Sequence, residues 1–455
     1  MEYLSLLMFI CICVVLLFGY PVALTLAGTS LLFAGGATLI GVFEPTFMTT
    51  LPSRMYGIVN NQTLLAVPLF VFMGNVLEKA KIAENLLVSM AQLFGKFRGG
   101  LAISVTIVGM LLAASTGIVG ATVVTMGLLS LPTMLKSGYD RAFSSGLICA
   151  TGTLGQIIPP SIALVLLGDV LSNSYQKAQL DMGNFSPETI SVGDLFAGAV
   201  IPGLLLVVFY IIYCVVITII KPEKVADVDV EETNFELLLF IKALLPPVIL
   251  VSLVLGSILL GFATPTEAAG VGAFGSLALA KLNGQLSLNN LRAVMLSTTK
   301  ITSMVFLILI GASLFSLVFR GLGGEELIKH FFIDLPGGVI TATVIVMLVI
   351  FLLGFILDFI EITFVVVPIV APILFVMGID PLWLGIMIAV NLQTSFLTPP
   401  FGFALFYLRG VADKVIKTSE IYKGVLPFIA LQLLLMCVLS LWPQLVTWLP
   451  SKIYG

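Results

Sequence analysis

Two apolar segments of this chain are each interrupted by a pair of prolines, and the residues around these breaks could bind a polar solute or a cation. The first pair is Pro159 and Pro160, and the second is Pro399 and Pro400, 240 positions later in each case. A proline pair interrupts a helix and frees backbone carbonyls and amides, which lipid does not tolerate but a lined cavity does. Matched breaks in the two halves of a chain indicate the binding site of a secondary transporter.

Side chains at the two breaks could hydrogen-bond a polar solute or complete the oxygen shell of a cation. The helix that follows each proline pair presents its N-terminal amides, which favour anionic groups. We therefore interpret these residues as candidates for substrate contact at the helix breaks: Pro159, Pro160, Ser161, Gln393, Pro399 and Pro400.

Two further apolar regions, about 100–136 and 339–378, turn at stretches of small or polar residues, Ser115–Thr122 and Gly354–Thr363. Backbone carbonyls and hydroxyls at such a turn can bind a hard cation such as sodium, although small residues also occur where helices simply pack closely. Each arm is about 14–18 residues, or roughly 21–27 Å, slightly short of a hydrocarbon core of about 30 Å. Length therefore favours re-entrant helical hairpins, while two full spans in each region stay open.

Two carboxylates, Asp358 and Glu361, lie three residues apart in the second of these regions. Ionisable groups at membrane depth are costly and usually functional, so they could bind a cation or carry a proton. Alternatively, they could cap the second arm as solvated N-terminal residues, which the helix dipole favours.

Composition limits the class of protein. The chain has 455 residues, of which 59% are hydrophobic and 10% charged, with a net charge of -3 and a mean hydropathy of +1.17. These values indicate a multi-pass membrane protein. No basic patch suggests nucleic-acid binding. The sequence also lacks metalloprotease, nucleotide-binding and hydrolase motifs, so we do not expect an enzyme.

We expect an all-α polytopic membrane protein with about ten spans, two of them broken, plus the two hairpins. The spans are expected at about 4–19, 21–41, 62–78, 140–171 (broken), 195–220, 238–262, 264–282, 295–319, 381–408 (broken) and 424–447. Basic connectors alternate with acidic or sparse ones, which places the N-terminus outside.

The two halves then form an inverted repeat, because each holds five crossings and one hairpin region, and an odd number of crossings inverts the second half. The first repeat covers 1–222, with its hairpin at about 100–136 and its broken span at 140–171. A polar linker covers 223–236. The second repeat covers 237–448, with its hairpin at about 339–378 and its broken span at 381–408.

Three motifs in order resemble the large membrane subunit of TRAP (tripartite ATP-independent periplasmic) transporters. They are Gly152–Ser161, Ala263–Ala269 and Asn391–Gly402. The resemblance covers nearly the whole chain. It implies a sodium-driven importer of organic acids in the bacterial inner membrane, with 2-oxo acids among the candidate substrates. It also implies an elevator mechanism, in which the hairpins and broken spans slide as a transport domain against a scaffold.

The resemblance also implies the coupling ion, the partners and the sodium sites. Sodium is the coupling ion and no tightly bound organic cofactor is expected; the partners are a separate small four-span membrane subunit, a periplasmic solute-binding protein, the organic-acid substrate and the lipid bilayer. The first sodium site would use Ser115, Thr116, Gly117, Gly120, Thr122, Gly152, Thr153 and Gly155. The second would use Gly354, Asp358, Glu361, Thr363, Asn391, Thr394, Ser395 and Thr398.

Other classes stay open. A single-component ion-coupled anion transporter or antiporter of the same inverted-repeat hairpin fold would work without partners. A structural or proton-conducting subunit would need chains of intramembrane ionisable residues, for which Asp358 is the nearest candidate. No Arg or Lys falls near the breaks or tips, so the sequence names no side-chain counter-ion for a substrate carboxylate.

Overall fold

A computed structural model describes residues 3–94, 97–225, 237–412 and 416–455. Every regular element in these ranges is a helix. Seven of the described helices are long and apolar enough to cross a membrane, and further apolar helices are shorter. The prediction of an all-α polytopic membrane protein is therefore confirmed. Residues 226–236 of the expected linker lie outside the described ranges.

The chain forms two compact units, and neither corresponds to one half of the sequence. Unit 1 comprises Met1–Leu65, Leu166–Ser191 and Thr299–Leu384. Unit 2 comprises Ala66–Val165, Val192–Thr298 and Gly385–Gly455. The two units group residues that lie close together in space. They do not test the inverted repeat, which relates the two halves of the sequence, so the repeat stays a prediction.

Unit 1 holds the N-terminal helices and the second hairpin. Its elements are α1 (Tyr3–Leu17), α2 (Val22–Leu39), η1 (Pro45–Thr50), α3 (Leu51–Val59), most of α9 (Ile162–Asp181) and of α13 (Leu288–Gly321), α14 (Gly324–Ile333), α15 (Gly338–Leu353), α16 (Phe359–Glu361), the π-helical turn η4 (Ile362–Val366), α17 (Val367–Val376) and the start of α18 (Pro381–Leu397). Helix α15 packs against α17 and η4, so the region 339–378 folds back on itself. A re-entrant hairpin and two full spans would both pack in this way, so the hairpin stays a prediction.

Unit 2 holds the first hairpin and most of both broken spans. Its elements are α4 (Ala66–Lys79), α5 (Ile82–Phe94), α6 (Gly100–Thr116), α7 (Val119–Lys136), α8 (Arg141–Thr153), η2 (Leu154–Gln156), the start of α9, α10 (Val192–Ile220), η3 (Pro222–Lys224), α11 (Leu237–Leu259), α12 (Pro265–Leu282), the start of α13, the rest of α18, α19 (Phe403–Val411), α20 (Thr418–Leu441) and α21 (Gln444–Ile453).

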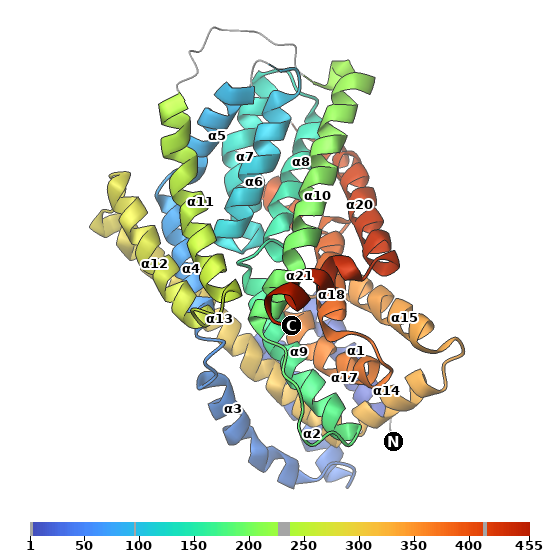
Figure 1. The fold of residues 1–455 in the computed structure, drawn as a ribbon. Coiled ribbons are helices and arrows are strands. Elements are labelled where there is room, and N and C mark those ends of the chain that lie inside the picture. Colours follow the sequence, from blue (N-terminus) through green and yellow to red (C-terminus); the bar gives the residue numbers. More distant parts are fainter. Residues whose placement is uncertain (1–2, 95–96, 226–236, 413–415) are drawn as a thin grey trace. The chain divides into compact units, whose positions relative to one another are not determined.

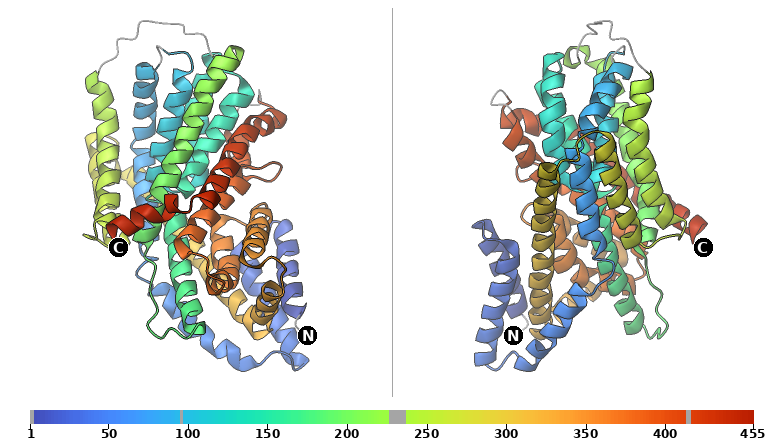
Figure 2. Two further views of the ribbon diagram at one scale, coloured as in Figure 1. Left: turned by 45° about the vertical axis from the view of Figure 1, so that its right-hand side comes forward. Right: turned by 90° about the vertical axis from the view of Figure 1, so that its left-hand side faces the viewer.

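The first hairpin lies inside a cluster of helices in unit 2. Helices α6 and α7 pack against each other, with α5 against α6 and α8 against both (Figure 1). Helix α4 lies along α12, as the right-hand view of Figure 2 shows. Helix α6 has 17 residues, or about 26 Å at 1.5 Å per residue, which is shorter than a hydrocarbon core of about 30 Å. The second arm, α7, has 18 residues and is one of the seven described helices long enough to cross a membrane, so length leaves both a hairpin and two spans open.

Small residues allow the helices of unit 2 to approach at backbone distance. A Cβ built on Gly146 of α8 would lie 2.0 Å from the carbonyl oxygen of Gly424 in α20. A Cβ on Gly424 would lie 1.8 Å from the carbonyl oxygen of Ala142. No larger side chain fits at this crossing, so the broken span is fixed against α20 by the absence of side chains.

Four helices were not expected from the sequence: α3, α5, α14 and α21, of 9, 13, 10 and 10 residues. They are amphipathic, with an apolar face and charged residues outside that face, and contain no apolar run long enough to span a bilayer. Two expected elements are longer than predicted. The first broken span continues to Asp181, and the span predicted at 295–319 extends over Leu288–Gly321.

Candidate functional site

The first broken span ends its helix where the sequence predicts. Asp140 caps α8 by accepting a hydrogen bond from the backbone N–H of Phe143 at 2.9 Å, and the helix ends at Thr153. A short turn, η2, leads into Pro159 and Pro160, and α9 begins at Ile162. Because proline cannot donate a backbone hydrogen bond, the segment between the two helices is free to present its oxygens elsewhere.

The tip of the first hairpin is closed by a glycine. Helix α6 ends at Thr116, and Gly117 adopts φ +61°, a left-handed conformation that favours glycine. The N–H of Gly117 donates to the carbonyl of Ala113 at 2.9 Å. The hydroxyl groups of Thr116 and Thr122 lie 2.7 Å apart and join the two arms. This hydrogen bond fixes the shape of the tip.

The hairpin is held against the broken span at backbone distance. A Cβ on Gly152 of α8 would lie 2.2 Å from the side chain of Val123 in α7. Gly155 is in ordinary contact, since a Cβ there would lie 3.5 Å from the carbonyl oxygen of Ala113. A Cβ on Gly117 would lie 3.2 Å from the backbone nitrogen of Ile162. The predicted residues of the first sodium site are therefore brought together within unit 2.

The polar groups at the first hairpin tip and the first break are mostly carbonyl and hydroxyl oxygens. The last carbonyls of a helix have no intrahelical partner, and those of Ser115 and Thr116 come within 3.1–3.3 Å of a Cβ built on Gly74 of α4. Ser115, Thr116, Thr122 and Thr153 are buried. Gly120 lies at the start of the second arm, where a Cβ would meet the ring of Tyr407 at 3.1 Å. Carbonyl and hydroxyl oxygens without carboxylates suit a hard monovalent cation.

The two broken spans meet at positions that the 240-residue register relates. The side-chain amide of Gln393 in α18 donates to the hydroxyl of Thr153 at 3.3 Å, a pair 240 residues apart. Gln432 of α20 reaches the same hydroxyl at 3.5 Å and donates to the hydroxyl of Tyr210 in α10 at 2.8 Å. All four side chains are buried. The amide oxygens of Gln393 and Gln432 have no hydrogen-bond partner among the described residues.

Sequence reasoning identified Thr153 and Gln393 but missed Tyr210 and Gln432. Both are polar side chains inside long apolar spans, and that isolation is the signal that could have found them. Their hydrogen bonds connect the broken spans to α10 and α20.

The remaining polar residues of the second break are satisfied within α18. The hydroxyls of Thr394, Ser395 and Thr398 donate to backbone carbonyls three or four residues earlier, at 2.7–2.8 Å. Asn391 is also buried. After the break, the hydroxyl of Tyr422 donates to the carbonyl of Pro400 at 3.1 Å. On the first broken span, the hydroxyl of Ser161 donates to the carbonyl of Gln156 at 3.1 Å.

The second hairpin tip, in unit 1, contains a capping box. Asp358 accepts a hydrogen bond from the backbone N–H of Phe359 at 2.7 Å, and Glu361 accepts one from the N–H of Asp358 at 2.9 Å. Thr363 lies in the π-helical turn, and its buried hydroxyl has no partner in the described part of the chain. The first arm ends before Gly354. The capping geometry that the sequence left open is thus present.

The second predicted sodium site divides between the two units. Its tip residues belong to unit 1, and Asn391–Thr398 belong to unit 2. Within the described residues no group of three or more His, Cys, Asp or Glu side chains could hold a metal ion.

Comparison with known proteins adds the family. Residues 9–445 match the family described as tripartite ATP-independent periplasmic transporter, DctM component. The C4-dicarboxylate TRAP transporter large permease of Vibrio cholerae is 30% identical, covering 99% of this chain and 98% of that protein. The ectoine TRAP transporter large permease of Halomonas elongata is 27% identical, covering 95% and 96%.

A further relative and one solved structure complete the comparison. The sialic acid TRAP transporter large permease of Vibrio cholerae is 28% identical, covering 94% of this chain and 95% of that protein. The crystal structure of the Alcanivorax borkumensis YdaH transporter has a TM-score of 0.58 and 16% identity and covers 99% of both chains. At this identity the structural likeness shows the fold alone.

Proposed function

Because this chain belongs to the DctM components of tripartite ATP-independent periplasmic transporters, we propose that it is the large membrane subunit of a sodium-driven importer of organic acids. In this proposal a periplasmic solute-binding protein delivers the substrate, and a separate small four-span subunit is the partner in the bacterial inner membrane. The family supports transport and not catalysis as the role of the chain.

The observation that carries the sodium coupling is the contact between the first hairpin tip and the first broken span. The tip residues Ser115–Thr122 are held close against Gly152–Gly155. The carbonyls of Ser115 and Thr116, the last two of α6, lie past the last hydrogen bond of the helix. Burial of these oxygens is favourable only if something satisfies them, and sodium would do so. We therefore assign the first sodium site to this contact.

The second sodium site is proposed by the internal repeat. The tip Gly354–Thr363 corresponds to the first tip, and Asn391–Thr398 corresponds to the first break. The support within each unit is the unpartnered hydroxyl of Thr363 and the burial of the polar residues in α18. Asp358 and Glu361 would add negative charge to this site, where the first site has none.

Movement of the hairpins and broken spans as one transport domain would give alternating access. The close packing of α6, α7, α8 and η2 supports such a domain, since helices held at backbone distance move together. The hydrogen bond between Thr153 and Gln393 supports inclusion of both breaks in it.

Organic acids are the proposed substrate class, with 2-oxo acids among them. The relatives are named for C4-dicarboxylates, sialic acid and ectoine, which all carry a carboxylate group. A carboxylate would also suit the helix N-terminus after each proline pair, where free amides donate.

Uptake of radiolabelled organic acids into proteoliposomes tests this function. The proteoliposomes contain the chain and its small partner, with binding protein outside, and uptake is measured with and without an inward sodium gradient. Uptake that needs both sodium and the binding protein supports the proposal. Uptake by the chain alone would favour a single-component ion-coupled anion transporter or antiporter.

A further inference from the structure

Unit 1 contains an open cavity of about 640 Å³, lined by charged, polar and apolar side chains, that the sequence did not indicate. This volume falls in the range of small-molecule sites, about 300–1,000 Å³. Each wall is one face of a helix, because the lining residues repeat every three or four positions. On α13, for example, Ala312, Ser313, Ser316 and Arg320 line the cavity. The other walls are α3, α9 and the second hairpin from η4 to α17.

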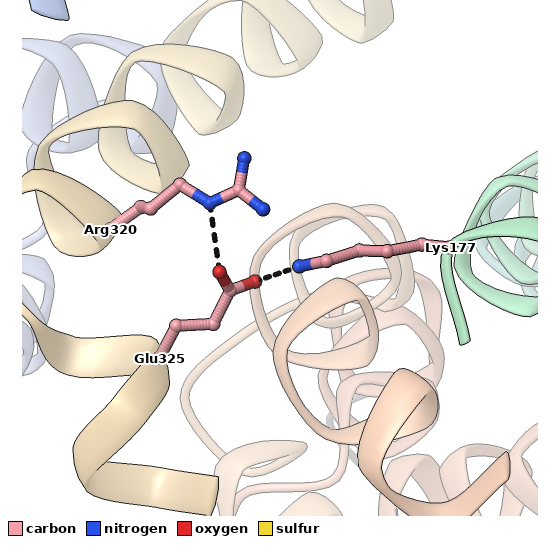
Figure 3. Close-up of polar contacts among 3 residues, drawn as sticks. All are labelled: Lys177, Arg320 and Glu325. Carbon is pink, nitrogen blue, oxygen red and sulfur yellow. Dashed lines mark hydrogen bonds and ion pairs between the residues drawn. The ribbon is translucent and has the colours of Figure 1, made fainter. Parts of the chain in front are cut away.

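A charged cluster forms one wall of this cavity. Both carboxylate oxygens of Glu325 are occupied, one by Arg320 at 2.8 Å and the other by Lys177 (Figure 3). Burial alone would raise the pKa of Glu325, but the hydrogen bonds and positive charges of Lys177 and Arg320 outweigh it and lower the pKa. Glu325 is therefore ionised at neutral pH, and the cluster of Lys177, Arg320 and Glu325 has a net charge of +1.

Arg54 of α3 adds a second excess positive charge. It lines the same cavity, is half-buried, and forms neither a hydrogen bond nor an ion pair with any described residue. Burial lowers the pKa of its guanidinium, and the like charge of Arg320 lowers it further, while Glu325 opposes the shift. A guanidinium stays protonated nonetheless. A partly buried cation beside a second cation is unfavourable unless an anion joins them.

The last ionisable group of the lining is Asp169 on α9, which accepts a hydrogen bond from the side-chain amide of Asn61 at 2.8 Å. Three cationic side chains against two carboxylates leave the lining with a net charge of +1. Neutral hydroxyl and amide groups, such as Ser174 and Asn173, supply additional donors.

We propose that this cavity binds the carboxylate group of the transported organic acid, with Arg54 as the anchoring cation and Glu325 as an internal carboxylate that competes for Arg320 and Lys177. The inference rests on the proposed transport function and gives the carboxylate a site in unit 1 that is separate from the helix N-termini after the proline pairs. Arginine suits this role because its planar guanidinium can hold a carboxylate by two hydrogen bonds. Phe364, Pro368 and Pro372 would pack against the apolar part of the ligand.

The two charged residues predict opposite effects. Arg54→Gln removes the unpaired cation, so a carboxylate should bind at least about tenfold more weakly. The folded protein should lose little stability, because Arg54 forms no hydrogen bond or ion pair with a described residue that the substitution would break. Glu325→Gln removes the competing carboxylate and raises the net charge of the lining to about +2, so the same ligand should bind several-fold more tightly.

Binding to the full chain, purified with its membrane partner, tests the proposal. The probes are pyruvate, 2-oxoglutarate, succinate and N-acetylneuraminate, with succinamide as an uncharged control, measured by calorimetry at two salt concentrations. Arg292→Gln is the matched control variant, since Arg292 is an exposed arginine on α13 outside the cavity. Thermal unfolding of each variant reports stability separately.

The expected result is carboxylate binding that weakens with salt, is lost in Arg54→Gln, is strengthened in Glu325→Gln and is unchanged in Arg292→Gln. Binding of no carboxylate in the panel, or equal binding by wild type and Arg54→Gln, would overturn the site. Weaker binding in Glu325→Gln would mean that the cluster is structural and would also contradict it. Sodium-dependent uptake that survives in Arg54→Gln would reject this cavity and leave the proposed function standing.

Discussion

Replacement of Gly152 by alanine is the most direct perturbation of the contact between the first hairpin and the first broken span. A Cβ at this position would lie 2.2 Å from Val123 Cγ2 and 3.2 Å from Val123 Cα, whereas ordinary contact begins at 3.4 Å. The shortfall at Cγ2 is therefore about 1.2 Å (3.4 − 2.2). Either the Val123 side chain leaves its rotamer or α7 moves away from α8.

The expected cost follows from this geometry. Over-packing of a close-packed interior destabilises by about 1–3 kcal/mol. A movement of about 1 Å in groups that must hold a specific geometry can also reduce a rate about 100-fold. We therefore expect Gly152→Ala to lower the unfolding temperature and to reduce sodium-dependent uptake more than the loss of folded protein explains.

A second substitution should reverse part of the effect. In Gly152→Ala/Val123→Ala the clashing methyl is gone, and the shortfall to the remaining Val123 Cα is about 0.2 Å (3.4 − 3.2). Gly410→Ala is the matched control, because a Cβ there meets nothing within 4 Å. This exposed helical position should gain up to about 1 kcal/mol. The assays are thermal unfolding in detergent and uptake into proteoliposomes at several sodium concentrations.

Two outcomes would refute the reasoning. Equal stability and uptake in Gly152→Ala and Gly410→Ala would show that the helices are not held at the described distance. A double variant no better than Gly152→Ala would show that Val123 is not the obstacle. A loss confined to sodium affinity, restored in the double variant, would tie the packing to ion binding.

Three further predictions concern polar groups. Thr153→Val leaves the side-chain amides of Gln393 and Gln432 without their shared acceptor and should lower the unfolding free energy by about 1–3 kcal/mol. Thr153→Ser keeps the hydroxyl and should restore the stability, and an unaltered unfolding temperature in the valine variant would contradict the hydrogen-bond network. Asp358→Ala and Asp358→Asn should both weaken sodium-dependent uptake, while only the alanine variant loses the helix cap, which should lower the unfolding free energy by about 0.5–2 kcal/mol. Wild-type uptake by the asparagine variant would leave capping as the only role of Asp358. The two basic partners of Glu325 lower its pKa in the folded state, so its contribution to stability is complete above the ordinary glutamate pKa and is lost as pH falls through the lowered value. The unfolding temperatures of wild type and Glu325→Gln should differ by a constant amount from about pH 6 to 8 and begin to converge below about pH 4.5. A difference that titrates near neutral pH would refute the assignment.

The breaks and the first hairpin tip could be predicted because their cause is local. Proline cannot donate a backbone hydrogen bond and glycine tolerates a positive φ, so α8 had to end before Pro159 and α6 could turn at Gly117. The sequence singled out Thr153 and Gln393 separately, but their contact was not predicted, because equivalent positions in two repeats need not lie side by side.

The cavity of unit 1 could not be predicted, because its cause is long-range. Arg54, Lys177 and Arg320 are far apart in sequence, and each lies near the end of a helix where a basic residue is unremarkable by itself. Only the packing of the helices of unit 1 places their charged ends around one space. Short amphipathic helices such as α3 and α14 were missed for a related reason, since no apolar run long enough to span a bilayer marks them.

Sodium-dependent uptake tests the central claim most directly. Proteoliposomes containing the chain and its small partner, with the binding protein and a radiolabelled organic acid outside, should take up substrate only under an inward sodium gradient. Both Gly152→Ala and Asp358→Asn should raise the sodium concentration needed for half-maximal uptake. Uptake that proceeds equally without sodium, or without the binding protein, would contradict the account.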